Sequence, residues 1–180
     1  MAEAIALGRI ADLSAGDREA LRALSLAVYP PGESTSWPGR QLEWAPAEWC
    51  VCVRDDGGAL VSYVGISLRE ARYDGRAVRV GGIGGVKTHP SSRRLGLASI
   101  GIQRATEFFR EQADIGFGLL VCGAHLIAYY GRLGWREFSG QLLVQQHGST
   151  VEFTFNRIMT YGIQRAAPET GTIDVLGPPW

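Results

Sequence analysis

The 180-residue sequence lacks an excess of either charge, since 18 lysine and arginine residues are balanced by 18 aspartate and glutamate residues. A protein that binds nucleic acid or an anionic membrane normally carries a basic excess or patch, so this balance argues against both partners. Long apolar runs are also missing. No segment approaches the roughly 20 residues that span a bilayer, and no basic flank precedes an apolar core at the amino terminus. These absences predict a cytoplasmic protein without membrane contact.

Cysteine is scarce, with residues only at Cys50, Cys52 and Cys122. Their number is odd, no Cys-x-x-Cys pair occurs, and no histidine stands at metal-ligand spacing from them. We therefore expect reduced thiols rather than a disulfide framework or a metal site. Repeats, linkers and low-complexity tracts are missing too. We expect one domain over residues 1–180 that buries a single core, with residues 163–180 as a C-terminal tail.

The two best-known phosphate-binding loops are absent as well. A Walker loop needs a glycine directly before Lys-Thr, but Val86 precedes Lys87 and Thr88, and Pro90 prevents a helix from starting there. A dinucleotide fingerprint needs Gly-x-Gly-x-x-Gly between a strand and a helix. The glycine-rich segment 82–87 lacks the last glycine and lies inside an expected strand.

What the sequence does contain is a regular order of strands and helices. Strands are predicted where apolar residues alternate or run together, and helices where apolar residues recur every three or four residues. Ser14 and Asp17 are predicted to form a capping pair at the start of the first helix. Strands are expected at 5–11, 49–54, 59–69, 78–88, 115–122, 141–146 and 151–155, and helices after residue 14, from 97 to about 112 and over about 124–133. This order predicts an α+β fold with a mostly antiparallel mixed sheet, one parallel strand pair and flanking helices.

The turn before the long helix has the chemistry of an anion site. Arg93 and Arg94 supply positive charge, while Gly96 and Ala98 let ligand oxygens approach the main chain. Free N–H groups and the helix dipole at the start of a helix also favour an anion, particularly a diphosphate. An ordinary strand-to-helix turn is the alternative interpretation.

This turn resembles a known signature. The pattern Arg93-x-x-Gly96-x-Ala98, preceded by Val86-x-Thr88-x-Pro90, resembles the acyl-CoA motif of the Gcn5-related N-acetyltransferases (GNAT), with Thr88 where valine is usual. The order of strands and helices also matches the acyl-CoA acyltransferase fold of that family. The resemblance implies acetyl-CoA as the cofactor, with the Val86 N–H polarising the thioester carbonyl and main-chain groups near Thr88 binding the pantetheine arm. The further cofactor-binding residues that it implies are Arg93, Arg94, Leu95, Gly96, Leu97, Ala98 and Ser99.

A second motif lies in segment 129–135, which resembles the aromatic-Tyr-x-x-x-Gly-aromatic segment of the same family. There the residue equivalent to Tyr130 protonates the departing CoA sulfur. A phenol with a pKa of about 10 keeps its proton at neutral pH and can donate it to the leaving thiolate. The alternative is that Tyr129 and Tyr130 are only packing aromatics.

The resemblance further implies direct transfer of the acetyl group to an amine, without an acyl-enzyme, so that Cys122 is not needed as a nucleophile. Gly123 stands where many members carry an asparagine. A general base is not evident; His89, His125 and solvent are the candidates.

Within the family, the chain most resembles the aminoglycoside 2′-N-acetyltransferases, through segments 130–135 and 173–180. In that group the tail folds back to the acceptor pocket. The proline- and tryptophan-rich stretch 29–46 predicts a stiff loop that either lines a site or covers the core. Gly84 replaces an acidic residue of the related enzymes, so a less charged amine remains an equal alternative. The predicted substrate-binding residues are Glu33, Trp37, Trp44, Asp174 and Trp180.

The sequence therefore predicts an acetyl-CoA-dependent N-acetyltransferase for a small-molecule amine, with an aminoglycoside and antibiotic resistance as the specific candidates. A non-catalytic acyl-CoA sensor and a protein-amine acetyltransferase are the alternatives. Related enzymes are commonly dimeric, so a homodimer is compatible with the resemblance, although the sequence does not decide between monomer and dimer.

Overall fold

The computed structural model describes residues 2–32 and 37–180. The first half of the chain forms β1 (Ala2–Arg9), α1 (Ala15–Val28), β2 (Trp49–Asp55), β3 (Leu60–Tyr73), β4 (Arg76–Thr88) and α2 (Leu97–Glu111). The second half forms β5 (Ile115–Cys122), α3 (Ile127–Arg132), β6 (Arg136–Phe138), β7 (Gln141–Gln146), β8 (Ser149–Glu152), β9 (Arg157–Gly162) and β10 (Thr172–Asp174). None of the helices in these ranges is long and apolar enough to cross a membrane.

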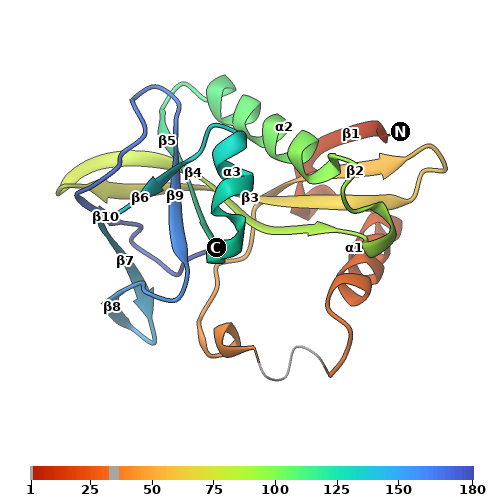
Figure 1. Ribbon diagram of the computed structural model, residues 1–180, viewed down its shortest axis with the longest axis horizontal. Helices are drawn as coiled ribbons and strands as arrows, with labels where there is room; N and C mark the ends of the chain where they lie inside the picture. The colour runs from red at the N-terminus through yellow and green to blue at the C-terminus, as the bar shows by residue number, and fades with distance from the viewer. Residues whose placement is uncertain (1, 33–36) are drawn as a thin grey trace.

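Within the described residues, ten strands join in one sheet (Figure 1). Its main path runs β6-β9-β5-β4-β3-β10-β7-β8, while β2 pairs with β3 and β1 with β2. β4 and β5 run parallel because α2 carries the chain back along the sheet, and this confirms the predicted mixed sheet with a parallel pair across the long helix. A second parallel pair, between β7 and β10, was not part of the prediction.

Several element boundaries differ from the predicted ones. The first strand covers residues 2–9 rather than 5–11, because residues 10–12 form a 3₁₀ turn. The hairpin of β7 and β8 ends at Glu152 rather than at residue 155, and the rings of Phe153 and Phe155 pack against Trp44 instead. The predicted helix at 124–133 is a 3₁₀ turn followed by α3. The prediction also omits β9, β6 and β10. Strands β6 and β10 have only three residues each and are too short to show an alternating pattern.

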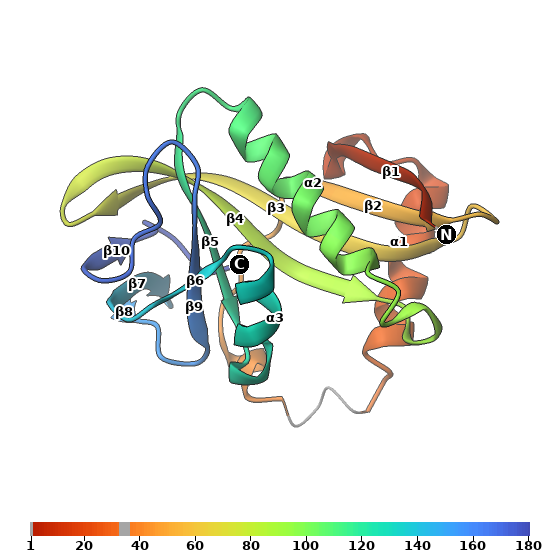
Figure 2. The same cartoon turned by 45° about the horizontal axis from the view of Figure 1, so that its top comes forward.

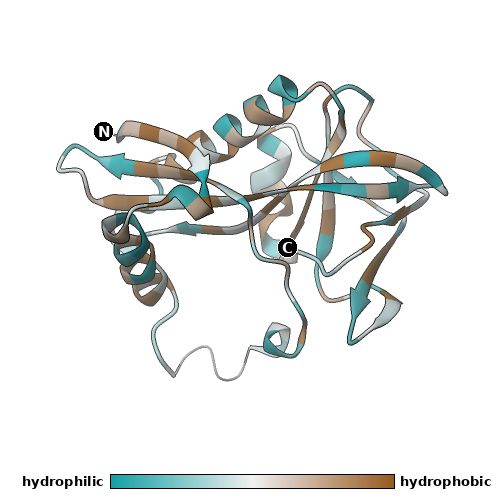
Figure 3. Ribbon diagram, turned by 180° about the vertical axis from the view of Figure 1, so that it is seen from behind, coloured by the Kyte–Doolittle hydropathy of each residue, from teal (hydrophilic) through white to brown (hydrophobic). Residues whose placement is uncertain are grey.

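Alternate residues of the central strands face opposite layers of the molecule. Val51 of β2 belongs to the core beneath α2, together with Phe109, whereas its neighbour Cys50 packs with Leu24 of α1. Helices α2 and α3 therefore lie on one face of the sheet, and α1 covers part of the other face (Figures 2 and 3).

The C-terminal segment covers another part of that second face. Strand β10 pairs with both β3 and β7 and so holds the segment in register. At the end of the segment, Trp180 is only 9% exposed. Its indole N–H donates to the backbone oxygen of Leu119 at 3.2 Å, and the Arg69 guanidinium lies 4.9 Å from the ring centre. The tail is thus packed against the sheet.

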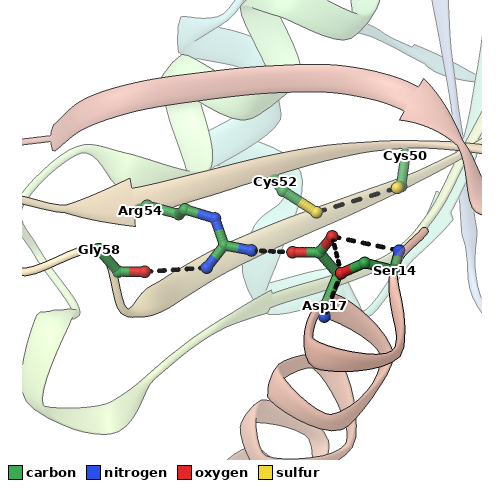
Figure 4. Close-up of polar contacts among 6 residues, drawn as sticks. All are labelled: Ser14, Asp17, Cys50, Cys52, Arg54 and Gly58. Carbon is green, nitrogen blue, oxygen red and sulfur yellow. Dashed lines mark hydrogen bonds and ion pairs between the residues drawn. The ribbon is translucent and has the colours of Figure 1, made fainter.

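Helix α1 is tied to the sheet at its first turn (Figure 4). The Asp17 N–H donates to the Ser14 hydroxyl at 3.1 Å, and the Ser14 N–H donates to the Asp17 carboxylate, which confirms the predicted capping pair. The same carboxylate forms an ion pair with Arg54 of β2. Hydrogen bonds from Ser14, together with the Arg54 charge, hold the pKa of Asp17 below its ordinary value.

Candidate functional site

A bulge interrupts β4 where the sheet opens. Tyr63 pairs with Lys87 and Gly65 with Gly84, so two residues of β4, Gly85 and Val86, lie opposite a single residue of β3. Gly85 has a φ of 60°, in the left-handed region that glycine adopts without steric cost. The extra residue kinks the strand at this point.

The same region of β4 separates from β5. The last pair between the two strands is Ile83 with Leu120, although β4 continues to Thr88 and β5 to Cys122. Figure 2 shows the two strands diverging, with α3 lying beside the opening. Backbone N–H and C=O groups along the diverging edges are therefore not taken up by the ladder between these strands.

The turn from β4 into α2 has an unusual backbone. Arg94 has a φ of 65° and Gly96, the residue before the helix, a φ of 80°. Among the described residues, no side chain caps α2, in contrast to Ser14 at the start of α1. The first N–H groups of α2 are thus open to a ligand, and the dipole of this 15-residue helix favours an anion there. The Arg93 side chain donates to the Thr88 carbonyl at 3.4 Å and stays against the turn.

These elements enclose a cleft of about 390 Å³ between the end of β4, the turn, α2 and α3. Its lining contains most of the predicted cofactor residues and the predicted acid; Leu95 does not line it and is 68% exposed. The residues that line the cleft are Val86, Thr88, Ser92, Arg93, Arg94, Gly96, Leu97, Ala98, Ser99, Leu126, Tyr129 and Tyr130. Folding therefore brings the two sequence motifs to one site.

Tyr130 is a buried residue in the lining of this cleft. It is 5% exposed, and its ring packs edge-on against Tyr129 and Trp135. Burial raises the pKa of Tyr130 well above its ordinary value, and the nearby Cys122 thiol adds to this effect. The phenol therefore keeps its proton throughout the physiological range. A buried, protonated hydroxyl in the lining of a cleft is suited to act as an acid.

Tyr129 and Ser99 join the two walls of the cleft. The Tyr129 hydroxyl on α3 lies 3.1 Å from the Ser99 hydroxyl on α2. Burial raises the pKa of Tyr129, although the Ser99 hydrogen bond partly offsets this. Three residues that line the cleft are not among the site residues predicted from the sequence: Ser92, Leu126 and Tyr129. Of these, only Tyr129 could have been found from the sequence, because it belongs to the aromatic motif that contains Tyr130.

On the opposite face of β4, two glycines make room for Trp180. A Cβ on Gly82 would lie 2.1 Å from the indole ring, and a Cβ on Gly84 would lie 2.7 Å from the main-chain carbonyl carbon of Trp180. The main chain of Trp180 therefore lies beside the bulge, across the strand from the cleft.

Trp37, Trp44 and Asp174 do not line the cleft. Trp37 stacks on Trp44 with ring centres 5.9 Å apart, and Trp44 packs edge-on against Phe153. The Asp174 carboxylate accepts the Leu176 N–H at 2.9 Å and closes a local turn. Glu33 lies outside the described residues.

The three cysteines do not line the cleft. Burial, with the nearby Glu137 carboxylate, raises the pKa of Cys122 to about 11, so little thiolate forms at neutral pH. Cys50 and Cys52 are buried beneath α1 with their sulfur atoms 3.9 Å apart (Figure 4). Within residues 2–32 and 37–180, no group of three His, Cys, Asp or Glu residues could hold a metal ion.

Comparison with known proteins identifies the architecture. The model of the Acetyltransferase (GNAT) family matches residues 18–135. None of the curated proteins matches the chain in sequence.

Among solved structures, the chain is similar to the GNAT family N-acetyltransferase YhbS from Escherichia coli in complex with CoA, with a TM-score of 0.61, 15% identity, and 97% of this chain and 89% of that chain covered. It is similar to Escherichia coli ElaA, with a TM-score of 0.60, 17% identity, and 89% and 99% covered. Arabidopsis thaliana NAA60, solved in complex with a bisubstrate analogue, gives a TM-score of 0.60 at 16% identity, with 91% and 100% covered. At these identities the three structures show a shared fold.

Proposed function

Because the chain belongs to the acetyltransferase (GNAT) family, whose model covers residues 18–135, we propose that it transfers an acetyl group from acetyl-CoA to the amine of a small molecule. The observation that carries this proposal is the composition of the cleft. The uncapped start of α2, the arginines of the turn and the buried Tyr130 line one cavity of about 390 Å³.

The residues around the cleft fit this cosubstrate. The CoA diphosphate is an anion, and Arg93, Arg94 and the open N–H groups at the start of α2 suit it. The main-chain groups of β4 beyond Ile83, which do not pair with β5, suit the amide groups of a pantetheine arm. The CoA complex of YhbS, which shares the fold, supports this assignment. When bound, acetyl-CoA supplies an acetyl group activated as a thioester.

Two groups of this chain have roles in the proposed transfer. The Val86 N–H, beside the bulge, would donate a hydrogen bond to a carbonyl oxygen and stabilise the negative charge that develops on it. Tyr130 would hold its proton in the buried cleft and release it to the leaving sulfur. The raised pKa of Tyr130 keeps the phenol protonated, so that it can donate a hydrogen bond to the leaving sulfur.

For the acceptor, we propose a small-molecule amine and place aminoglycosides among the candidates because of the sequence resemblance in segments 130–135 and 173–180. The packing of the Trp180 main chain against Gly84, beside the bulge, supports a role for the C-terminal segment on the acceptor side. Trp37 and Trp44 pack within an aromatic cluster, which supports their interpretation as core-covering residues rather than as substrate contacts.

The proposal is tested by measuring thiol release from acetyl-CoA with aminoglycosides, polyamines, amino acids and peptides as acceptors. We expect turnover with at least one small-molecule amine. Tight CoA binding without any turnover would favour the sensor, and turnover with peptides alone would favour a protein-amine acetyltransferase. The absence of CoA binding by calorimetry would contradict the whole proposal.

The role of Tyr130 has its own test. Tyr130→Phe should lower kcat by about 100-fold or more, the usual contribution of a positioned acid, while leaving acetyl-CoA affinity nearly unchanged. Tyr73→Phe is the matched control, because that hydroxyl donates to the Thr170 carbonyl away from the cleft. An unaltered rate in Tyr130→Phe would remove this residue from the mechanism.

A further inference from the structure

The only lysine of the sequence stands next to the bulge, one residue after Val86. Val86 lines the cleft on the α2 side of β4. The Lys87 ammonium instead donates to the hydroxyl of Ser25 on α1, at 3.1 Å. Successive residues of a strand point to opposite faces, so Lys87 lies on the face that α1 and Trp180 cover.

The Lys87 ammonium has few partners for a half-buried charge. It lies 5.1 Å from the ring centre of Tyr63, its cross-strand neighbour, and it donates one hydrogen bond to Ser25. The Ser25 hydroxyl itself donates to the Leu21 carbonyl at 2.8 Å. An ammonium has three N–H donors. Among the described residues, no acceptor takes the other two and no carboxylate pairs with the charge.

The surroundings of this charge are apolar and aromatic. Burial lowers the pKa of Lys87, and no carboxylate within residues 2–32 and 37–180 offsets that effect. Tyr63 is 5% exposed, and its ring lies 3.7 Å from the position that a Cβ on Gly85 would take. The ammonium, the aromatic ring and the bulge are therefore contiguous. A partly desolvated cation in such a place is stabilised most by an anion that reaches it.

We propose that Lys87 binds an anionic group of the acceptor, so that the amine acetylated by this enzyme also carries a carboxylate or a phosphate. This inference rests on the proposed acetyl transfer. It narrows the acceptor class, since a polycationic aminoglycoside would bring positive charge to an ammonium that no described carboxylate neutralises. Val86 lines the cleft on one face of β4, and the Lys87 ammonium lies on the other face, so the acetyl donor and the anionic group of the acceptor would lie on either side of one strand.

The experiment compares acceptors that differ only in charge. Thiol release is measured for amino acids against their carboxamides, for phosphoethanolamine against ethanolamine, and for one aminoglycoside. We expect the anionic member of at least one pair to have the lower KM, and the pair that responds identifies the anion as carboxylate or phosphate. Equal KM values within both pairs, or the aminoglycoside as the best acceptor, would overturn the inference while leaving acetyl transfer intact.

A variant links the effect to this residue. Lys87→Met should raise the KM of the anionic acceptor about tenfold or more, the size of one charge-assisted hydrogen bond, and leave the KM of its uncharged partner and of acetyl-CoA unchanged. Lys87→Arg should restore part of the loss. The matched control is Arg76→Met, an exposed cation at the far end of β4, which should change neither KM. Equal losses for charged and uncharged acceptors in Lys87→Met would show a structural role only and contradict the proposal.

Discussion

Replacing Gly82 by alanine should expel the indole of Trp180 from its place on the sheet. A Cβ at this position would lie 2.1 Å from Cε2, 2.4 Å from Nε1 and 2.5 Å from Cζ2 of the ring. The ring is held by its hydrogen bond to Leu119 and by the Arg69 guanidinium above it. It cannot move by the ångström or more that the new methyl group demands and keep both contacts.

The expected loss of stability can be estimated from the surface that the Trp180 ring no longer buries. A tryptophan buries about 150–250 Å² of surface, and at about 25 cal/mol per Å² this is worth about 4–6 kcal/mol. That figure is an upper bound, because the unfolded chain already hides part of the surface. Truncation of a buried aromatic typically costs about 3–5 kcal/mol. We therefore expect Gly82→Ala to lower the free energy of unfolding by about 3 kcal/mol, and Trp180→Ala to lower it by a similar amount.

Both changes remove the same contact, so their effects should not add. The double variant should cost about as much as either single variant, because the alanine methyl group fits once the indole is gone. Urea unfolding of the four proteins, analysed with a common m-value, measures the coupling. Gly8→Ala is the matched control, since its Cβ would meet no atom within 4 Å, and it should change stability by less than about 1 kcal/mol. Additive costs, or a Gly82→Ala variant as stable as the wild type, would refute the packing argument.

Two further predictions concern the cleft. Gly96→Ala places a side chain on a residue with a φ of 80°, and no atom lies within 4 Å of the new methyl group, so that only backbone strain opposes the change. We expect this strain to lower the free energy of unfolding by about 1–2 kcal/mol in the same urea assay. An unchanged free energy of unfolding would mean that the turn has another conformation in solution. Tyr130 should also make the stability of the protein depend on pH. Burial raises the pKa of Tyr130 above 10.0 in the folded protein, so this tyrosine ionises at a lower pH in the unfolded chain. The free energy of unfolding should therefore be constant below about pH 10 and fall as the pH rises further. Tyr130→Phe should lose less stability than the wild type between pH 9 and 11, whereas parallel curves would indicate a solvated phenol.

The cofactor side of the site was largely readable from the sequence because its residues are close together in the chain. Seven of them occupy consecutive positions from Arg93 to Ser99, and a strand-turn-helix unit brings them together by local geometry. Leu95 is the exception, since the turn directs it to solvent. Tyr130 came from a separate motif, and folding of α3 against α2 brings it to the same cleft.

The acceptor side was much less predictable. Trp37 and Trp44 were predicted as substrate contacts, and their rings pack against Phe155 and Phe153, more than a hundred residues away. Asp174 was also predicted as a substrate contact, and its carboxylate accepts the Leu176 N–H. Nothing in the local sequence of these residues identifies the partners that they meet.

By itself the sequence indicated the order of most strands and helices and the position of the turn before α2. These features follow from periodicity and from backbone chemistry within a few residues. Only the tertiary structure decided what covers each face. Lys87 meets Ser25 across 62 positions of the chain, and Gly82 and Gly84 meet Trp180, because those contacts depend on how distant elements pack and not on the propensity of any segment.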